Sequence, residues 1–278
     1  SRTHLYPGDP GLFGPGSVSW KVMGDVSSFV GGVRALLLQA LHPEVAAGVA
    51  DHSQYEKDPL GRLNRTSLFV TTANYGSMPE VEAAVRIVRQ AHKPVSGTSE
   101  RGIRYSANQP QLGAWVHNTL TDSFLEAYQT FCHGLTAQEA DQFVQEQAKI
   151  GELLGVTELP LTASDLRNWV TEHPSLSDSE ALRSAWDFLR KPPLQAGQLL
   201  GYKVVRAAAV ATLPSELAQL AGTSSRRGAL VGGQCIVSSL RWAMKHSPAW
   251  KAALDRCGAS YDATKFRSFE EPSPTEDH

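Results

Sequence analysis

The chain has 278 residues, enough for one large domain or two small ones with a sizeable core. Its 26 Lys and Arg residues nearly balance 28 Asp and Glu residues, which excludes the broad basic surface of proteins that bind nucleic acids or anionic membranes. The cysteines, Cys132, Cys235 and Cys257, are too widely spaced for a disulfide framework or a CxxC metal site, so we expect a reducing compartment.

The N-terminal segment, residues 1–16, is polar and punctuated by proline and glycine, and it lacks the apolar run of a secretory signal. The longest apolar stretches, 35–41 and 207–213, are much shorter than the roughly 20 residues that a bilayer span requires. We therefore expect a soluble, cytoplasmic protein without a membrane span.

Nearly every segment after residue 17 has helical periodicity, and proline, glycine and capping signals divide it into elements. The expected helices are 33–41, 44–50, 62–76, 79–92, 110–133, 136–154, 164–172, 179–190, one or two within 194–220, 226–246 and 248–257. Residues 97–109 are expected to form a loop, and no run has strand periodicity. The sequence predicts a single all-α domain over residues 1–265, followed by a disordered tail, 266–278.

Two arginines and a threonine form the most informative pattern. In a helix, Arg62, Arg65 and Thr66 share one face, with apolar Phe69 and Val70 one turn further on. Positive charges beside an apolar stripe are costly unless an anionic or electron-rich group lies opposite them. The alternative is a solvated helix face.

The next expected helix ends its apolar stripe in a histidine. Val81, Val85, Val88 and His92 recur at helical spacing. A lone histidine on such a stripe is more often a satisfied core or capping residue than a ligand. The apolar space in front of it could, however, hold a porphyrin. Cationic donors on one helix and an imidazole on the next could then form the two walls of a haem pocket.

Each of the further candidate residues has more than one interpretation. His117, in the middle of a helix, is either a buried, hydrogen-bonded residue or a propionate partner or alternative ligand. His42 sits at a helix junction, where a capping role is favoured over ligation. Arg34 lies in an apolar run and should pair with an anion, either a propionate or an internal carboxylate. His52 is expected to be a loop or capping residue, and His173 has no supporting neighbours.

Six motifs resemble, in order and spacing, the bacterial oxygenase family that includes the mycophenolic-acid-pathway oxygenase. That family is distantly similar to latex clearing protein, the rubber oxygenase. The motifs are Leu-Phe-Gly-Pro-Gly-Ser-Val-Ser-Trp at 12–20, Gly-Gly-Val-Arg-Ala-Leu-Leu-Leu-Gln-Ala-Leu-His-Pro at 31–43, Val-Ala-Ala-Gly-Val-Ala-Asp-His-Ser at 45–53, Asp-Pro-Leu-Gly-Arg-Leu-Asn-Arg-Thr at 58–66, Trp-Val-His at 115–117 and Leu-Pro-Ser-Glu-Leu at 213–217.

The resemblance implies a helical, globin-like core that binds b-type haem iron through a proximal histidine, with extra C-terminal helices. The distal pattern Arg-x-x-Lys-Thr of latex clearing protein maps onto Arg62, Arg65 and Thr66, with arginine in place of lysine at position 65. Arginine keeps its charge but presents a planar fork, so the lysine's role in holding an oxygen ligand is in doubt. The proximal position corresponds to His92, with His117 next.

The resemblance also implies the reaction. We expect a haem b-dependent oxygenase that uses dioxygen to oxidise a small apolar molecule, unsaturated or isoprenoid-like. In this reading His92 holds the iron, Arg62, Arg65 and Thr66 act on the distal side, and Arg34, His42 and His117 contact the cofactor. The alternatives are a non-catalytic helical protein that binds haem or a hydrophobic metabolite, and a peroxidase-like haem enzyme. The apolar C-terminal helices could also supply a homodimer face.

Overall fold

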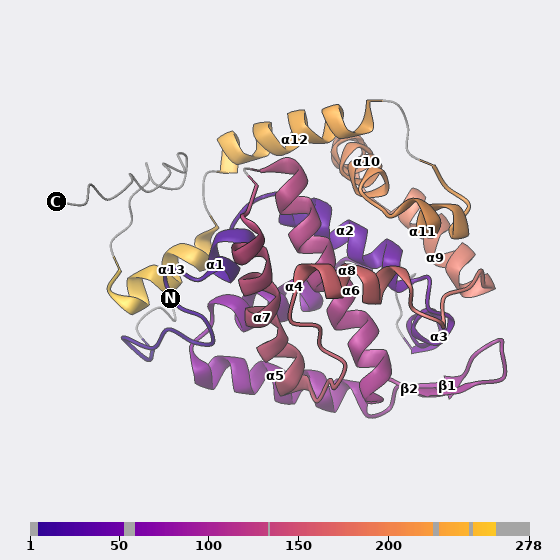
Figure 1. Cartoon of the computed structure of the whole chain (residues 1–278), viewed down its shortest axis with the longest axis horizontal. Helices are drawn as coiled ribbons and strands as arrows, with labels where there is room; N and C mark the ends of the chain where they lie inside the picture. The colour runs from indigo at the N-terminus through magenta and orange to yellow at the C-terminus, as the bar shows by residue number, and fades with distance from the viewer. Residues whose placement is uncertain (1–4, 53–58, 133, 225–227, 245–246, 260–278) are drawn as a thin grey trace.

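Figure 1 shows a computed structural model of the chain, which describes residues 5–52, 59–132, 134–224, 228–244 and 247–259. The described part is helical apart from one small sheet, which confirms the all-α prediction. None of its helices is both long enough and apolar enough to cross a bilayer. The predicted disordered tail, 266–278, lies outside the described residues.

The helices are α1 (Val18–Met23), α2 (Ser28–Gln39), α3 (Pro43–His52), α4 (Pro59–Tyr75), α5 (Met78–His92), α6 (Pro110–Phe131), α7 (Ala137–Leu154), α8 (Ala163–Thr171), α9 (Glu180–Arg190), α10 (Ala196–Ala211), α11 (Ser215–Leu220), α12 (Ala229–Met244) and α13 (Pro248–Cys257). The strands are β1 (Ser96–Thr98) and β2 (Arg104–Ser106).

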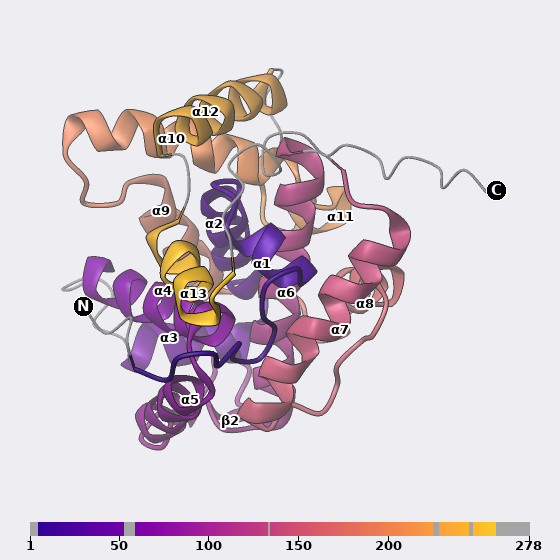
Figure 2. The ribbon, with the colours of Figure 1, turned by 90° about the vertical axis from the view of Figure 1, so that its left-hand side faces the viewer.

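Helices α2 and α6 pack against each other at the centre of the molecule. Their backbones approach closely at Gly31, where a Cβ atom would lie 2.8 Å from Phe124 Cδ1 and 3.0 Å from the Ser123 carbonyl oxygen. Figure 2 shows α10 and α12 across one end of this pair, α7 and α8 on one side, and α3, α4 and α5 on the other. The main hydrophobic cluster extends from Val18 in α1 to Val237 in α12.

Local signals explain many of the helix boundaries. The Thr136 hydroxyl accepts a hydrogen bond from the Glu139 backbone N–H at 3.2 Å, and the Glu139 carboxylate accepts one from the Thr136 N–H at 2.9 Å. This reciprocal pair is the capping box expected at the start of α7. The helix ends at Gly155, whose φ of 81° is a left-handed conformation that glycine adopts without strain.

The expected loop at 97–109 contains the two short strands, which the sequence analysis missed. They pair antiparallel, with Ser96 opposite Ser106. Tyr105 on β2 is buried, and its hydroxyl donates a 2.6 Å hydrogen bond to Asp51 Oδ2 on α3. Three residues per strand are too few to show an alternating pattern, so the pairing could not be predicted from periodicity.

Candidate active site

The segment that contains Arg62 and Arg65 is helical, as the sequence argument required. Arg62, Arg65 and Thr66 all lie in α4, which ends before Gly76 as predicted. The Arg65 and Thr66 side chains are exposed, whereas Phe69 and Val70 are half-buried. The Arg62 side chain lies outside the described residues. The polar part of α4 therefore faces outward and its apolar part leads into the protein.

The segment of α4 around Arg65 has an uncovered surface. Every side chain from 64 to 68 is exposed, including 67 % of Leu68. One or two turns later Ala73 and Tyr75 are buried. An exposed leucine beside Arg65 and Thr66 gives this surface both apolar and cationic character.

His92 is the last residue of α5, a helix that contacts α4. Val81 and Val85 of the predicted stripe are buried, and the His92 side chain is half-buried. Burial lowers the pKa of His92 below its ordinary value of 6.5, so the ring is neutral at pH 7. Among the described residues, no hydrogen bond is made to this ring. His92 therefore presents a neutral imidazole at the end of the helix that follows α4.

His117 lies in the interface between α6 and α7. Its ring forms a hydrogen bond with the Gln147 backbone carbonyl, and burial lowers its pKa to about 4. A Cβ atom on Gly151 would lie 3.2 Å from His117 Nε2, so the ring rests on the α7 backbone. One turn later, a Cβ atom on Gly155 would lie 2.9 Å from an Arg89 nitrogen. Both α5 and the His117 ring thus abut the C-terminal end of α7.

Arg34 is enclosed in the core between α2, α6 and α10. Its side chain is 0 % exposed, and Nη1 donates to Asp122 Oδ2 at 2.6 Å and to Ser123 Oγ at 2.9 Å. Nε donates to the Thr212 carbonyl at 3.2 Å. Arg167 donates a further hydrogen bond to Asp122 Oδ1 at 2.8 Å. The internal carboxylate, one of the two partners expected for Arg34, is the one present in the structure.

His42 immediately precedes α3, at the helix junction expected from the sequence. It is 4 % exposed, and Nδ1 lies 3.4 Å from Glu44 Oε2. Burial, with a contribution from nearby His173, lowers the pKa of His42 to about 4. The two imidazole centroids are 5.4 Å apart, and each ring also contacts Trp115. Sequence reasoning missed His173 because its partners are distant in the chain.

The predicted residues therefore fall into four places rather than one. Helices α4 and α5 carry Arg62, Arg65, Thr66 and His92, whereas Arg34 belongs to the charged network of the core. His42 belongs to an aromatic cluster beside α8. His117 lies between α6 and α7, near the end of α5. The roles predicted for these residues toward a cofactor stay predictions.

Comparison with protein families matches residues 20–245 to the family described as ER-bound oxygenase mpaB/B'/rubber oxygenase, catalytic domain. The matched range includes α2 to α12 and all of the candidate residues. Searches of curated proteins and of solved structures each gave no match.

Proposed function

The chain belongs to the mpaB/rubber oxygenase family and is an oxygenase catalytic domain, and we propose that it uses a b-type haem bound between α4 and α5. In this proposal the haem and dioxygen serve to oxidise a small apolar, unsaturated molecule. The family assignment confirms the resemblance seen in the sequence motifs. The cofactor, the substrate and the roles of the residues are proposed beyond the family assignment.

The haem proposal rests mainly on the environment of the His92 ring. It is half-buried and neutral, and its nitrogens make no hydrogen bond within the described part of the chain. Among the other described histidine rings, His117 bonds to the Gln147 carbonyl and His173 accepts from the Ser175 N–H. His42 Nδ1 makes no hydrogen bond but lies 3.4 Å from the Glu44 carboxylate. A neutral imidazole with a free lone pair is the usual protein ligand of haem iron.

The uncovered surface of α4 also fits a haem. A porphyrin is flat and apolar and carries two anionic propionates. Covering Leu68, now 67 % exposed, would remove apolar surface from water and stabilise the complex by about 1.5–3 kcal/mol. The Arg65 guanidinium, on the same part of α4, could form a charge-assisted pair with a propionate or a polar oxygen of the substrate.

Haem held by one histidine would supply a redox-active iron that activates dioxygen. Arg62 and Arg65 would orient anionic or polar oxygen atoms by hydrogen bonding, and the Thr66 hydroxyl would hold a water and pass a proton. Half-buried Phe69 and Val70 would contact the apolar substrate. If the substrate is an alkene cleaved at its double bond, the two atoms of dioxygen end in two carbonyl groups, so no external reductant is needed.

Oxygen uptake by the haem-loaded protein tests this function. Squalene, an unsaturated isoprenoid, should be consumed with dioxygen and give carbonyl products, whereas saturated squalane should not react. Arg65→Leu should lower the rate by about tenfold or more, because it removes a charged hydrogen-bond donor. Arg86→Leu, at an exposed position of α5, is the matched control and should have little effect.

Two outcomes would favour the alternatives. Haem binding without uptake on any apolar alkene would favour a binding protein that does not turn over. Oxidation that needs hydrogen peroxide and proceeds without dioxygen would favour a peroxidase-like enzyme.

A further inference from the structure

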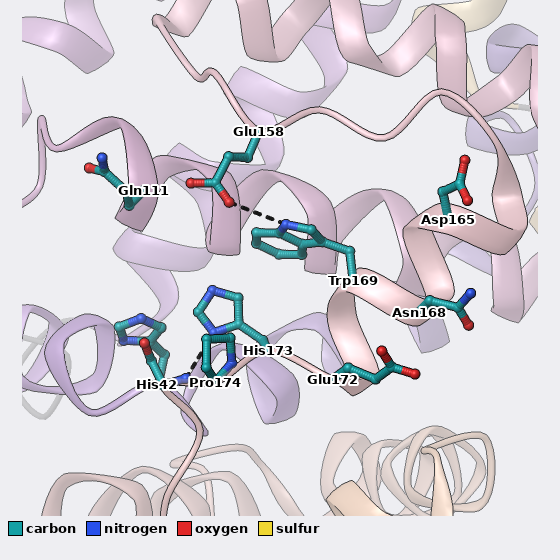
Figure 3. Close-up of a pocket in the computed structure, with 10 residues that line it drawn as sticks. His42, Gln111, Glu158, Asp165, Asn168, Trp169, Glu172, His173 and Pro174 are labelled. Atoms are coloured by element: carbon teal, nitrogen blue, oxygen red, sulfur yellow. Dashed lines mark hydrogen bonds between the residues drawn. The ribbon is translucent and has the colours of Figure 1, made fainter.

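A pocket of about 580 Å³ opens beside α8, and none of Arg65, Thr66 and His92 lines it. Trp169 of α8 and His173, just after that helix, form part of its wall (Figure 3). The volume lies within the range of sites that bind small molecules. Nothing in the proposed oxygenase chemistry uses this pocket.

The inner wall is aromatic. The His173 ring stands edge-on to Trp169, with centroids 4.8 Å apart, and lies 5.4 Å from the His42 ring. Trp115 is fully buried behind them, with its centroid 5.0 Å from that of His173. In Figure 3 the His173 ring lies between His42 and Trp169. The pocket therefore offers several π surfaces, which attract cations electrostatically.

The rim is acidic. Glu158, Asp165 and Glu172 are exposed around the opening, and the lining includes no lysine or arginine. Asp165 lies four residues before Trp169 and Glu172 three residues after it, and in Figure 3 their carboxylates point away from the indole. Trp169 Nε1 donates a 3.3 Å hydrogen bond to Glu158 Oε2 and so holds that carboxylate next to the ring.

The two imidazoles do not offset this negative charge at pH 7. Burial lowers the pKa of His173 and lowers that of His42 to about 4. The His173 Nδ1 atom accepts a hydrogen bond from the Ser175 N–H at 3.3 Å, so the proton of the neutral ring is on Nε2.

His42 gives an independent sign of function. Although the side chain is buried, Nδ1 makes no hydrogen bond to any described residue, and the nearest carboxylate oxygen, Glu44 Oε2, is 3.4 Å away. Buried polar atoms without partners are rare and costly, and they require an explanation such as a functional site. His42 lines the pocket, so a ligand there would lie against the ring that carries this unpaired atom.

We propose that this pocket binds a small organic cation, with its ammonium group against the Trp169 ring and beside the Glu158 carboxylate. A haem is a poor fit, because acidic groups at the rim would repel its propionates. A metal ion is also a poor fit, since the described residues contain no group of three or more metal-ligating side chains. Gln111 and Asn168 line the same pocket and could bind polar groups of the cation's remaining part.

Choline and its uncharged isostere 3,3-dimethyl-1-butanol are the probes for this site. Titration of the purified protein, followed by saturation-transfer NMR, should show binding of choline and at least tenfold weaker binding of the alcohol. Trp169→Leu should weaken choline binding about three- to tenfold, the range expected for the loss of one cation–π contact. Glu158→Gln should weaken it about threefold or more.

Matched controls separate the site from general surface effects. Trp242→Leu removes an exposed tryptophan on α12, and Glu152→Gln removes an exposed carboxylate on α7. Both should leave choline binding unchanged. Glu158 is itself exposed, so its variant keeps the test valid if Trp169→Leu does not fold. Equal binding of choline and the alcohol, or unchanged choline binding in Glu158→Gln, would overturn the proposal.

Discussion

At the scale of single residues, the charged pair in the core has the clearest energetic consequence. Arg34 and Asp122 side chains are 0 % and 2 % exposed and meet at 2.6 Å. Both charges have lost their hydration, and the direct pairing together with bonds to Ser123 and Thr212 offsets that cost. Removing the Asp122 charge would leave Arg34 charged and buried without a carboxylate partner.

Asp122→Asn should therefore lower the free energy of unfolding by about 3–5 kcal/mol, the range for breaking a buried ion pair. Urea unfolding followed by circular dichroism measures this change. Asp187→Asn is the control, because Asp187 pairs with Arg190 at the surface, where ion pairs contribute little. Equal stability of the two variants would show that the core pair is not required.

The buried histidines give a second prediction, which concerns pH. Burial lowers the pKa of His42 and of His117 from 6.5 to about 4 in the folded state. Between these values the unfolded chain binds more protons than the folded chain, so stability rises with pH. The free energy of unfolding should fall as pH drops from about 6.5 to 4, by on the order of 3 kcal/mol for each histidine.

Urea titrations at several pH values measure this slope, and His117→Gln should make it shallower. An unchanged slope in that variant would mean that His117 already binds a proton in the folded protein near pH 6.

The sequence identified which histidines and arginines to consider, but not their partners. His92 was predicted from its place at the end of a valine stripe, a signal contained within one helix. The partners of Arg34, His42 and His117 come from segments distant in the chain: Asp122, His173 and the Gln147 carbonyl. Local periodicity gives no information about contacts between distant segments, so these partners could be identified only in three dimensions.

At the scale of elements, the crossing of α2 and α6 depends on a glycine. A Cβ atom on Gly31 would meet the Phe124 ring at 2.8 Å and the Ser123 carbonyl at 3.0 Å, whereas one on Gly32 would meet nothing within 4 Å. Both residues are in the interior of the same helix. Only Gly31 lies where the backbones of α2 and α6 approach closely, and Arg34 on α2 pairs with Asp122 on α6.

Gly31→Ala should destabilise the protein by about 1–3 kcal/mol, as over-packing does. Gly32→Ala should instead stabilise it by about 0.5–1 kcal/mol, because alanine has the better helix propensity. Thermal unfolding of the two neighbouring variants makes the comparison. If both shift the melting temperature in the same direction, the close crossing at Gly31 is not the reason for its glycine.

Helix boundaries with clear capping or proline signals were predictable, whereas α1 was not expected and α2 begins five residues before the expected start at 33. Pro110 and Pro248 each begin a helix, and Thr136 with Glu139 marks the start of α7, because these signals satisfy or remove free backbone donors at a helix terminus. The β1–β2 hairpin was not predictable, since its stability rests on tertiary contacts such as that of Tyr105 with Asp51.

At the scale of the whole molecule, the α2–α6 pair separates two regions of different chemistry. Helices α4 and α5 lie on one side and α8 lies on the other (Figure 2). Arg65 and His92 belong to the first two helices, and Trp169 of the pocket belongs to α8. The first side combines cationic and apolar surface, and the second combines aromatic and acidic surface. This arrangement suits a prosthetic group with anionic propionates on the first side and a cationic ligand on the second.

The ultraviolet–visible spectrum of the haem-loaded protein tests the central claim most directly. The wild-type protein and His117→Gln should each show a strong Soret band, because His117 is already bonded to the Gln147 carbonyl. His92→Ala should lose or shift the band, and added imidazole should restore it by replacing the missing ligand. A Soret band that is unchanged in His92→Ala, or no haem binding by the wild-type protein, would contradict the account.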